Sequence, residues 1–212
     1  MNSENNRIRL AGRVEEDAAY SHSMFGEKFY NVKLAVKRRS GNTDTLNITL
    51  SDRLTADMPR AGEEISATGQ IRTYNEVSDE GNRLKIVVFC QQAPEPAAFH
   101  VNEVYLKGYL CRKPYYRITP SGRELCDIML AVNRYGGKSD YIPCIAWGRN
   151  ARYMDTLEIG TPVSFTGRMQ SRIYTKIQPD GSAITKTAYE VSVMSLELWN
   201  SNDCGTNISL HL

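Results

Sequence analysis

The feature that most constrains this chain is an internal repeat of about a hundred residues, because a duplicated unit has to fold as a unit. The segment Asn6–Val14 matches Asn102–Leu110 at an offset of 102 − 6 = 96 residues. The other matches are Leu34–Val36 with Leu130–Val132, also offset by 96, and Gly62–Gly69 with Gly160–Gly167, offset by 98. The sequence therefore predicts two consecutive copies of one fold.

Alternating apolar positions and turn-residue clusters divide each unit into five predicted strands. They lie near 7–14, 28–37, 45–50, 64–74 and 84–89, and near 101–110, 124–133, 140–147, 162–173 and 188–198. A helix after the third strand is indicated by the helical spacing of Ala151, Met154 and Leu157. This order fits the five-stranded Greek-key barrel of the OB-fold. An immunoglobulin-like sandwich fits less well, because it has seven strands and no such helix.

We therefore predict an all-β chain of two tandem OB-fold barrels, each with a short helix between its third and fourth strands. The predicted boundaries are 1–90 for the N-terminal barrel, 91–100 for a linker, 101–199 for the C-terminal barrel and 200–212 for a short flexible tail. The segment Gln91–Pro96 is rich in proline and polar residues, which is typical of a semi-rigid spacer.

Composition narrows the function classes. The net charge of +2 is slight, so any basic surface for nucleic acid has to be local. Five cysteines form no C-x-x-C pair and three histidines are widely spread, which predicts no disulfide scaffold, no metal site and no catalytic residues. We expect a non-enzymatic protein without a cofactor. The polar N-terminus and the absence of a long apolar run predict no secretory signal and no membrane segment, hence a cytoplasmic, nucleoid-associated location.

The segment Asp140–Gly148, D-Y-I-P-C-I-A-W-G, alternates between two faces. The apolar face holds Ile142, Cys144 and Ala146, and the other face holds Tyr141, Pro143, Ile145 and Trp147. Two aromatic rings on the face opposite a core, with Arg149 just beyond, are typical of a stacking platform for nucleobases. The alternative is that Tyr141 and Trp147 are packing residues in a two-sided core.

The second unit resembles the bacterial single-stranded DNA-binding proteins. The matching motifs are N-E-V-Y-L-K-G-Y-L at 102–110, R-K-P-Y-Y-R-I-T-P-S-G-R at 112–123, L-A-V-N-R at 130–134, Y-I-P-C-I-A-W-G-R at 141–149, G-T-P-V-S-F-T-G-R-M-Q-S-R-I-Y at 160–174 and Y-E-V-S-V at 189–193. The resemblance implies stacking of bases on Tyr141, Trp147 and Tyr174, with a fourth aromatic near Tyr135. Two units per chain look like the two-unit members that pair as homodimers to supply four OB-folds. The family's acidic, partner-recruiting C-terminal tip is absent from S-N-D-C-G-T-N-I-S-L-H-L.

Basic residues interleave with these aromatics and are predicted to neutralise phosphates. The predicted cations are Arg112, Lys113, Arg117, Arg134, Lys138, Arg149, Arg168, Arg172 and Lys176. On the predicted fourth strand, Arg168, Arg172 and Tyr174 share one face, opposite Val163, Phe165 and Met169.

The first unit keeps the core pattern but not the aromatic face. Leu46, Ile48 and Leu50 reproduce the apolar side, whereas the other side reads Thr45, Asn47, Thr49 and Ser51. Lys and Arg minus Asp and Glu gives 13 − 14 = −1 over 1–96 and 13 − 10 = +3 over the remainder. We predict that the first unit is a weaker DNA contributor or an assembly module.

The sequence thus predicts sequence-tolerant binding and protection of single-stranded DNA in replication, recombination or repair. The alternative is an OB-fold assembly factor of the replication or primosome machinery with weak nucleic-acid binding. RNA is a second candidate ligand, because stacking alone does not distinguish the sugars.

Overall fold

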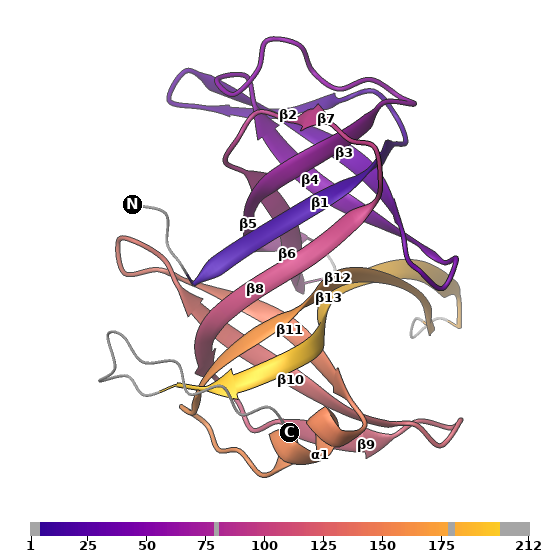
Figure 1. Ribbon diagram of the computed structural model, residues 1–212, viewed down its shortest axis with the longest axis vertical. Helices are drawn as coiled ribbons and strands as arrows, with labels where there is room; N and C mark the ends of the chain where they lie inside the picture. Colours follow the sequence, from indigo (N-terminus) through magenta and orange to yellow (C-terminus); the bar gives the residue numbers. More distant parts are fainter. Residues whose placement is uncertain (1–4, 79–80, 178–180, 200–212) are drawn as a thin grey trace.

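The computed structural model describes residues 5–78, 81–177 and 181–199. Two β-barrels stand one above the other along the long axis of the molecule, one built from strands between Asn6 and Cys90 and the other from strands between Val101 and Leu198 (Figure 1). The all-β, two-barrel architecture predicted from the repeat is confirmed. The predicted tail 200–212 lies outside the described residues. Within the described ranges, no helix is long and apolar enough to span a membrane.

The first barrel closes through five strands. They are β1 (Asn6–Val14), β3 (Glu27–Lys37), β4 (Thr43–Ser51), β5 (Glu64–Ser78) and β6 (Gly81–Cys90). Neighbours around the barrel run β1–β3–β4–β6–β5 and back to β1, and only the β4–β6 pair is parallel. This order and the parallel third and fifth strands are those of an OB-fold.

The second barrel repeats the same closure. Its strands are β8 (Val101–Leu110), β10 (Glu124–Asn133), β11 (Ser139–Trp147), β12 (Pro162–Ile177) and β13 (Ala183–Leu198), with helix α1 (Arg149–Asp155) after the third strand. The order is β8–β10–β11–β13–β12 and back to β8, with β11 and β13 parallel. Ala151 and Met154 of α1 are buried, as the helical spacing predicts.

The helix predicted between the third and fourth strands of the first unit is not formed. Residues 52–63, all of them described, consist of turns and bends. The Thr55 hydroxyl oxygen accepts a hydrogen bond from the Asp57 amide at 3.2 Å, a local turn that competes with helical bonding. Pro59 further disfavours helical geometry at Met58. The second unit has α1 because its equivalent segment carries neither feature.

Three short strands were not predicted. They are β2 (Ala19–Met24), β7 (Glu95–Pro96) and β9 (Tyr115–Ile118). β2 and β9 form hairpins on β3 and β10, and β7, which falls in the predicted linker, pairs with β5. The linker segment therefore lies against the first barrel at this point instead of running clear of it.

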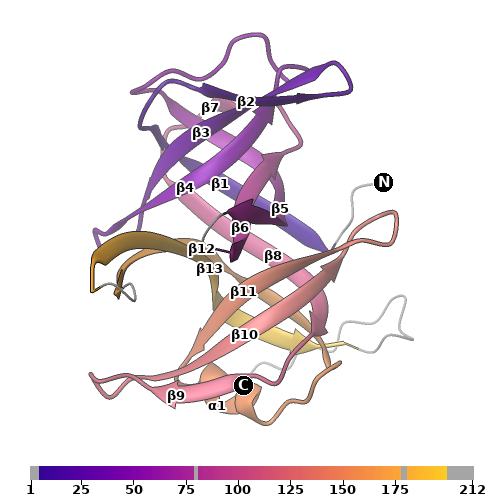
Figure 2. The same ribbon diagram turned by 180° about the vertical axis from the view of Figure 1, so that it is seen from behind.

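The barrels are joined by an antiparallel pairing of their first strands, β1 and β8, which runs from Asn6↔Leu106 to Ala11↔Val101. Figures 1 and 2 show these two strands side by side across the middle of the molecule. The pairing merges both barrels into one continuous sheet.

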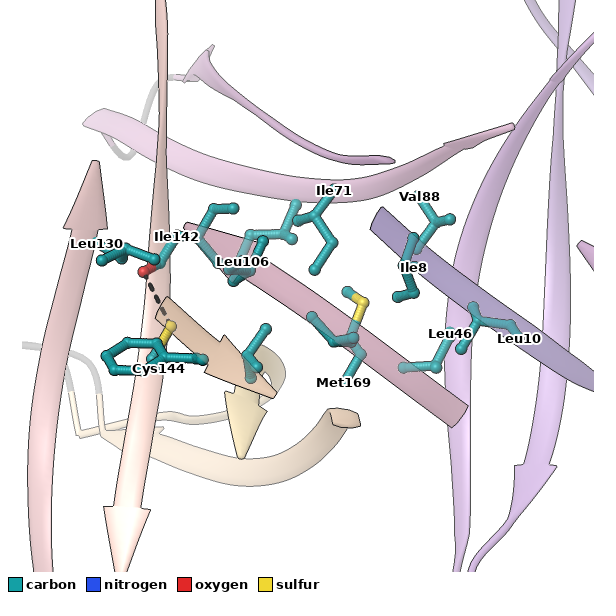
Figure 3. Packing of buried hydrophobic residues seen from close by; sticks show 14 of the residues in the cluster. Ile8, Leu10, Leu46, Ile71, Val88, Leu106, Leu130, Ile142, Cys144 and Met169 are labelled. Carbon is teal, nitrogen blue, oxygen red and sulfur yellow. Dashed lines mark hydrogen bonds between the residues drawn. The ribbon is translucent and has the colours of Figure 1, made fainter. Parts of the chain in front are cut away.

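One hydrophobic cluster runs through both barrels. Figure 3 shows Ile8, Leu46 and Val88 of the first barrel close to Leu106 and Met169 of the second. Burial of this apolar surface from both units is the main favourable term that holds the strands together. Close strand approach at the barrel seam needs glycine, since a Cβ at Gly108 would lie 2.3 Å from the Ala131 carbonyl oxygen.

Candidate nucleic-acid interface

Strand β11 presents aromatic rings on its outer face. Ile142, Cys144 and Ala146 are buried in the core, whereas Tyr141 is 50 % exposed and Trp147 is half-buried. The outer face is not uniformly open, because Ile145, predicted to share it, is only 4 % exposed. Tyr141 and Trp147 therefore lie toward the two ends of this face of β11, and Ile145 between them is buried.

Arg123 contacts the Trp147 ring. Its guanidinium carbon lies 4.4 Å from the ring centroid, which is a cation–π contact. Arg123 is not among the predicted cations, although it closes the motif R-K-P-Y-Y-R-I-T-P-S-G-R. The exposed guanidinium adds positive charge directly beside the Trp147 ring, which is the placement predicted for a phosphate-neutralising cation.

The hairpin of β12 and β13 carries a second aromatic group. Tyr174 is 36 % exposed, and the Arg172 guanidinium carbon lies 5.5 Å from its ring centroid. Arg172 Nε is also 4.0 Å from a Glu190 carboxylate oxygen. The chain reaches this position through a β-bulge between Thr166 and Gly167, which bends the hairpin away from the barrel. Lys176 follows in the same strand, and its side chain lies outside the described part of the chain.

The loop between β10 and β11 projects Tyr135 and Lys138. Both side chains are exposed, Tyr135 fully, beside Gly136 and Gly137, whose positive φ angles of 86° and 77° shape the turn. The Tyr135 ring and the Lys138 ammonium group on this turn are therefore open to contact from solvent.

Three further predicted cations, Arg149, Arg112 and Lys113, lie on other segments of the second barrel. Arg149 is exposed at the start of α1, and Arg112 is exposed in the loop after β8. Lys113 Nζ donates to the Leu157 carbonyl at 3.3 Å and pairs with Glu158, so it is partly committed within the protein. Arg112 and Lys113 border a depression of about 320 Å³ that also contains Tyr115, Pro143 and Glu190.

Arg134 and Arg168 are placed differently from the other predicted cations. Arg134 Nε donates to Asp140 at 2.6 Å, and Arg134 Nη2 donates to the Thr73 carbonyl of the first barrel at 2.9 Å. Arg168 Nη1 is 3.6 Å from the buried Asp44 carboxylate of the first barrel. Burial and the neighbouring Arg38 guanidinium lower the pKa of Arg168 below its ordinary value. These two guanidiniums therefore face contacts between the barrels.

Two of the contacts between the barrels are built around a fully buried aspartate. Asp140 is bound by Arg134 and by Arg72 of the first barrel, whose Nη1 donates at 3.0 Å. Asp44 is bound by Arg38, whose Nε donates at 2.6 Å, and faces Arg168. We call these the Asp140 junction and the Asp44 junction. Two cations offset the cost of burying each carboxylate.

The matching face of the first barrel is closed by its own polar contacts. The Ser51 hydroxyl donates to Glu27, and Ser51 is only 4 % exposed. The Thr45 hydroxyl donates to Glu15 at 3.0 Å. Since 27 + 96 = 123 and 51 + 96 = 147, the Glu27–Ser51 pair occupies the place of Arg123–Trp147. A buried hydroxyl and a carboxylate thus stand where the second barrel has a ring and a cation.

Comparisons with known proteins agree with this geometry. The profile of the Single-strand binding protein family matches residues 101–199. Single-stranded DNA-binding protein A of Bacillus subtilis (strain 168) is 34 % identical over 113 residues, 50 % of this chain and 65 % of that protein. Single-stranded DNA-binding protein 2 of Listeria monocytogenes is 33 % identical over 109 residues, 48 % of this chain and 68 % of that protein. The matched stretch thus spans about two thirds of each relative.

The solved structure of the wild-type single-stranded DNA-binding protein from Thermus aquaticus superposes over both barrels. The TM-score is 0.71 at 19 % identity, with 95 % of this chain and 96 % of that chain covered. A deletion mutant of the same protein gives 0.75 at 20 % identity, with 93 % of this chain and 96 % of that chain covered. At this identity the likeness establishes the shared fold.

Proposed function

Because this chain belongs to the single-strand binding protein family, we propose that it binds single-stranded DNA with little sequence preference and protects it during replication, recombination or repair. The observation that carries the proposal is the set of rings on the second barrel, in which Tyr141 and Tyr174 are exposed and Trp147 is half-buried, with Arg123 and Arg172 against two of them. Aromatic stacking tolerates any base, and each stacked base contributes about 1–3 kcal/mol. The role is one of binding without catalysis, in the cytoplasm.

Phosphate neutralisation is the second part of the proposal. Arg112, Lys138, Arg149 and Arg172 are exposed on the second barrel, and neutralising phosphates releases counterions. The first barrel contributes little to stacking, because the hydroxyl of Ser51 stands in place of an indole and is bonded to Glu27. We further propose that two chains associate as a homodimer, which gives four OB-folds in the assembly.

A fluorescence titration with oligo(dT) tests the function. Trp147 lies on the proposed binding face, whereas Trp199 packs edge-on against Tyr109, with ring centroids 5.3 Å apart, under the Lys107 ammonium group. Quenching should therefore come mainly from Trp147 and should be largely lost in Trp147→Phe. Weak quenching would favour the alternative function, an OB-fold assembly factor with weak nucleic-acid binding. A blunt duplex competitor should leave oligo(dT) binding undiminished, and effective competition by the duplex contradicts the preference for single strands. An oligo(U) competitor measures the preference for DNA over RNA.

A further inference from the structure

The β12–β13 hairpin, which carries Tyr174 and Arg172, extends beyond its own barrel. Strand β12 pairs with β8 only as far as Gly167, and after that point one edge of β12 has lost its strand partner. Figure 2 shows the hairpin curving toward the start of β4 in the first barrel. An unpaired strand edge needs other hydrogen-bond partners.

Side chains supply those partners at alternate residues along the edge. The Met169 amide donates to Asn102 Oδ1 at 2.8 Å, and the Ser171 amide donates to Oδ1 of the buried Asp44 at 2.9 Å. Asp44 belongs to β4 of the first barrel and is fully buried. The first barrel therefore completes the hydrogen bonding of the hairpin edge three residues before Tyr174.

Two further bonds join the hairpin to the same strand. The Thr45 amide donates to the Ser171 hydroxyl at 3.2 Å, and Asn47 Nδ2 donates to the Tyr189 hydroxyl at 3.1 Å. Ser171 and Tyr189 are cross-strand partners in the hairpin, so each strand of the hairpin is hydrogen-bonded to β4 at the same level along the hairpin. Thr45 and Asn47 occupy the positions in β4 that Tyr141 and Pro143 occupy in β11, since 45 + 96 = 141 and 47 + 96 = 143.

Beyond this level the hairpin has an exposed surface. Ile173 and Ile177 are each 73 % exposed. Among the contacts between the first barrel and the hairpin given above, those at Ser171 and Tyr189 lie nearest to Tyr174 along the hairpin. A ring on a free hairpin would lose conformational entropy on stacking with a base, whereas a docked hairpin has already lost part of it.

We propose that the first barrel uses the strand equivalent to the DNA-binding strand of the second barrel as a docking site for the β12–β13 hairpin. The occupant of this face at Thr45 and Asn47 is the hairpin of the same chain. Asp44 and Asn47 are positioning residues: they hold the hairpin so that Tyr174 and Arg172 meet the DNA. This inference rests on the proposed function, and it gives the first barrel a role without base stacking of its own.

The test combines amide hydrogen exchange with a double-mutant cycle. Asp44→Ala should speed exchange at residues 168–177 and 183–190 and weaken oligo(dT) binding roughly tenfold, as expected for loss of a bond to a charged group. In a protein that already carries Tyr174→Ala, adding Asp44→Ala should weaken oligo(dT) binding hardly further, because the positioned ring is gone. In a protein that carries Trp147→Ala, adding Asp44→Ala should weaken binding by the full amount. Asp57→Ala, which removes an exposed carboxylate of the same barrel, should change neither measurement.

Asn47→Ala is the second variant, because Asp44→Ala leaves Arg38 and Arg168 without their carboxylate and endangers folding. Asn47→Ala removes one hydrogen bond and should give the same pattern with a smaller loss, roughly two- to fivefold. Wild-type exchange in the hairpin of either folded variant overturns the proposal, as does a loss of equal size in the Tyr174→Ala and Trp147→Ala backgrounds. The exchange measurement needs no DNA. It therefore decides the docking even if wild-type protein failed to bind oligo(dT), which would refute the proposed function instead.

Discussion

Ile8 and Val104 face each other in the antiparallel pair of β1 and β8, and they hold the same place in the two repeats, since 104 − 8 = 96. Their neighbours pair reciprocally, Asn6 with Leu106 and Leu10 with Asn102. Equivalent residues opposite one another define a local twofold relation between the barrels, like that of an isologous interface between two copies. The Asp44 and Asp140 junctions follow the same relation, because 140 − 44 = 96.

Replacing Trp147 with Ala should weaken oligo(dT) binding by about 1–3 kcal/mol, roughly five- to 150-fold, because one stacked base loses its ring. The slope of log affinity against log salt should hardly change, since no phosphate contact is removed. Titrations at several salt concentrations measure both quantities. Ser51→Ala is the matched control in the first barrel and should leave affinity unaltered, although it removes the hydrogen bond to Glu27. Unchanged affinity in folded Trp147→Ala contradicts the stacking surface.

Arg172 and Arg168 lie four residues apart in β12, and we expect different effects from their loss. Arg172→Ala should reduce the steepness of the salt dependence by about 0.7, the value for one phosphate contact on a single strand. Arg168→Ala should leave that slope unchanged, because its guanidinium faces Asp44. It should instead lower the free energy of unfolding by about 1–3 kcal/mol, measured by urea denaturation. An equal reduction of the salt slope by both substitutions would place Arg168 on the DNA path.

Light scattering should give twice the chain mass of 23.9 kDa if two chains pair to supply four OB-folds. The mass should be constant over the concentration range in which oligo(dT) binding is measured. A mass of one chain at every concentration rules out the homodimer.

Alkaline pH should destabilise the fold through its buried thiols. Burial raises the pKa of Cys90 from 9.0 to about 12 and that of Cys126 to about 11, and it also raises the pKa of Cys144. Between pH 9 and pH 11 the unfolded chain releases thiol protons that the folded chain keeps, so stability falls as pH rises. Each thiol contributes up to about 1.4 kcal/mol per pH unit in that window. Urea denaturation at pH 8 to 10.5 measures the fall, and Cys90→Ala should make it less steep. An unchanged slope in Cys90→Ala means that this thiol does not contribute.

The sequence by itself determined the duplication, the five main strands of each barrel and the faces of those strands. The segment 101–110 was predicted as a strand and is β8, and 124–133 was predicted and is β10. The alternation of β11 likewise predicted which residues are buried, apart from Ile145. These features follow from a period of two along one segment, so no knowledge of distant partners is needed.

Only the tertiary structure decided what the polar residues contact. Arg168 and Arg172 share one face of β12, yet Arg168 points to Asp44 and Arg172 lies over Tyr174. Asp44 precedes Arg168 by 124 residues, and their proximity depends on how the barrels pack through β1 and β8. A local pattern can assign a side chain to a face of a strand. It cannot say whether another part of the chain or solvent covers that face, because burial is a property of the assembled fold.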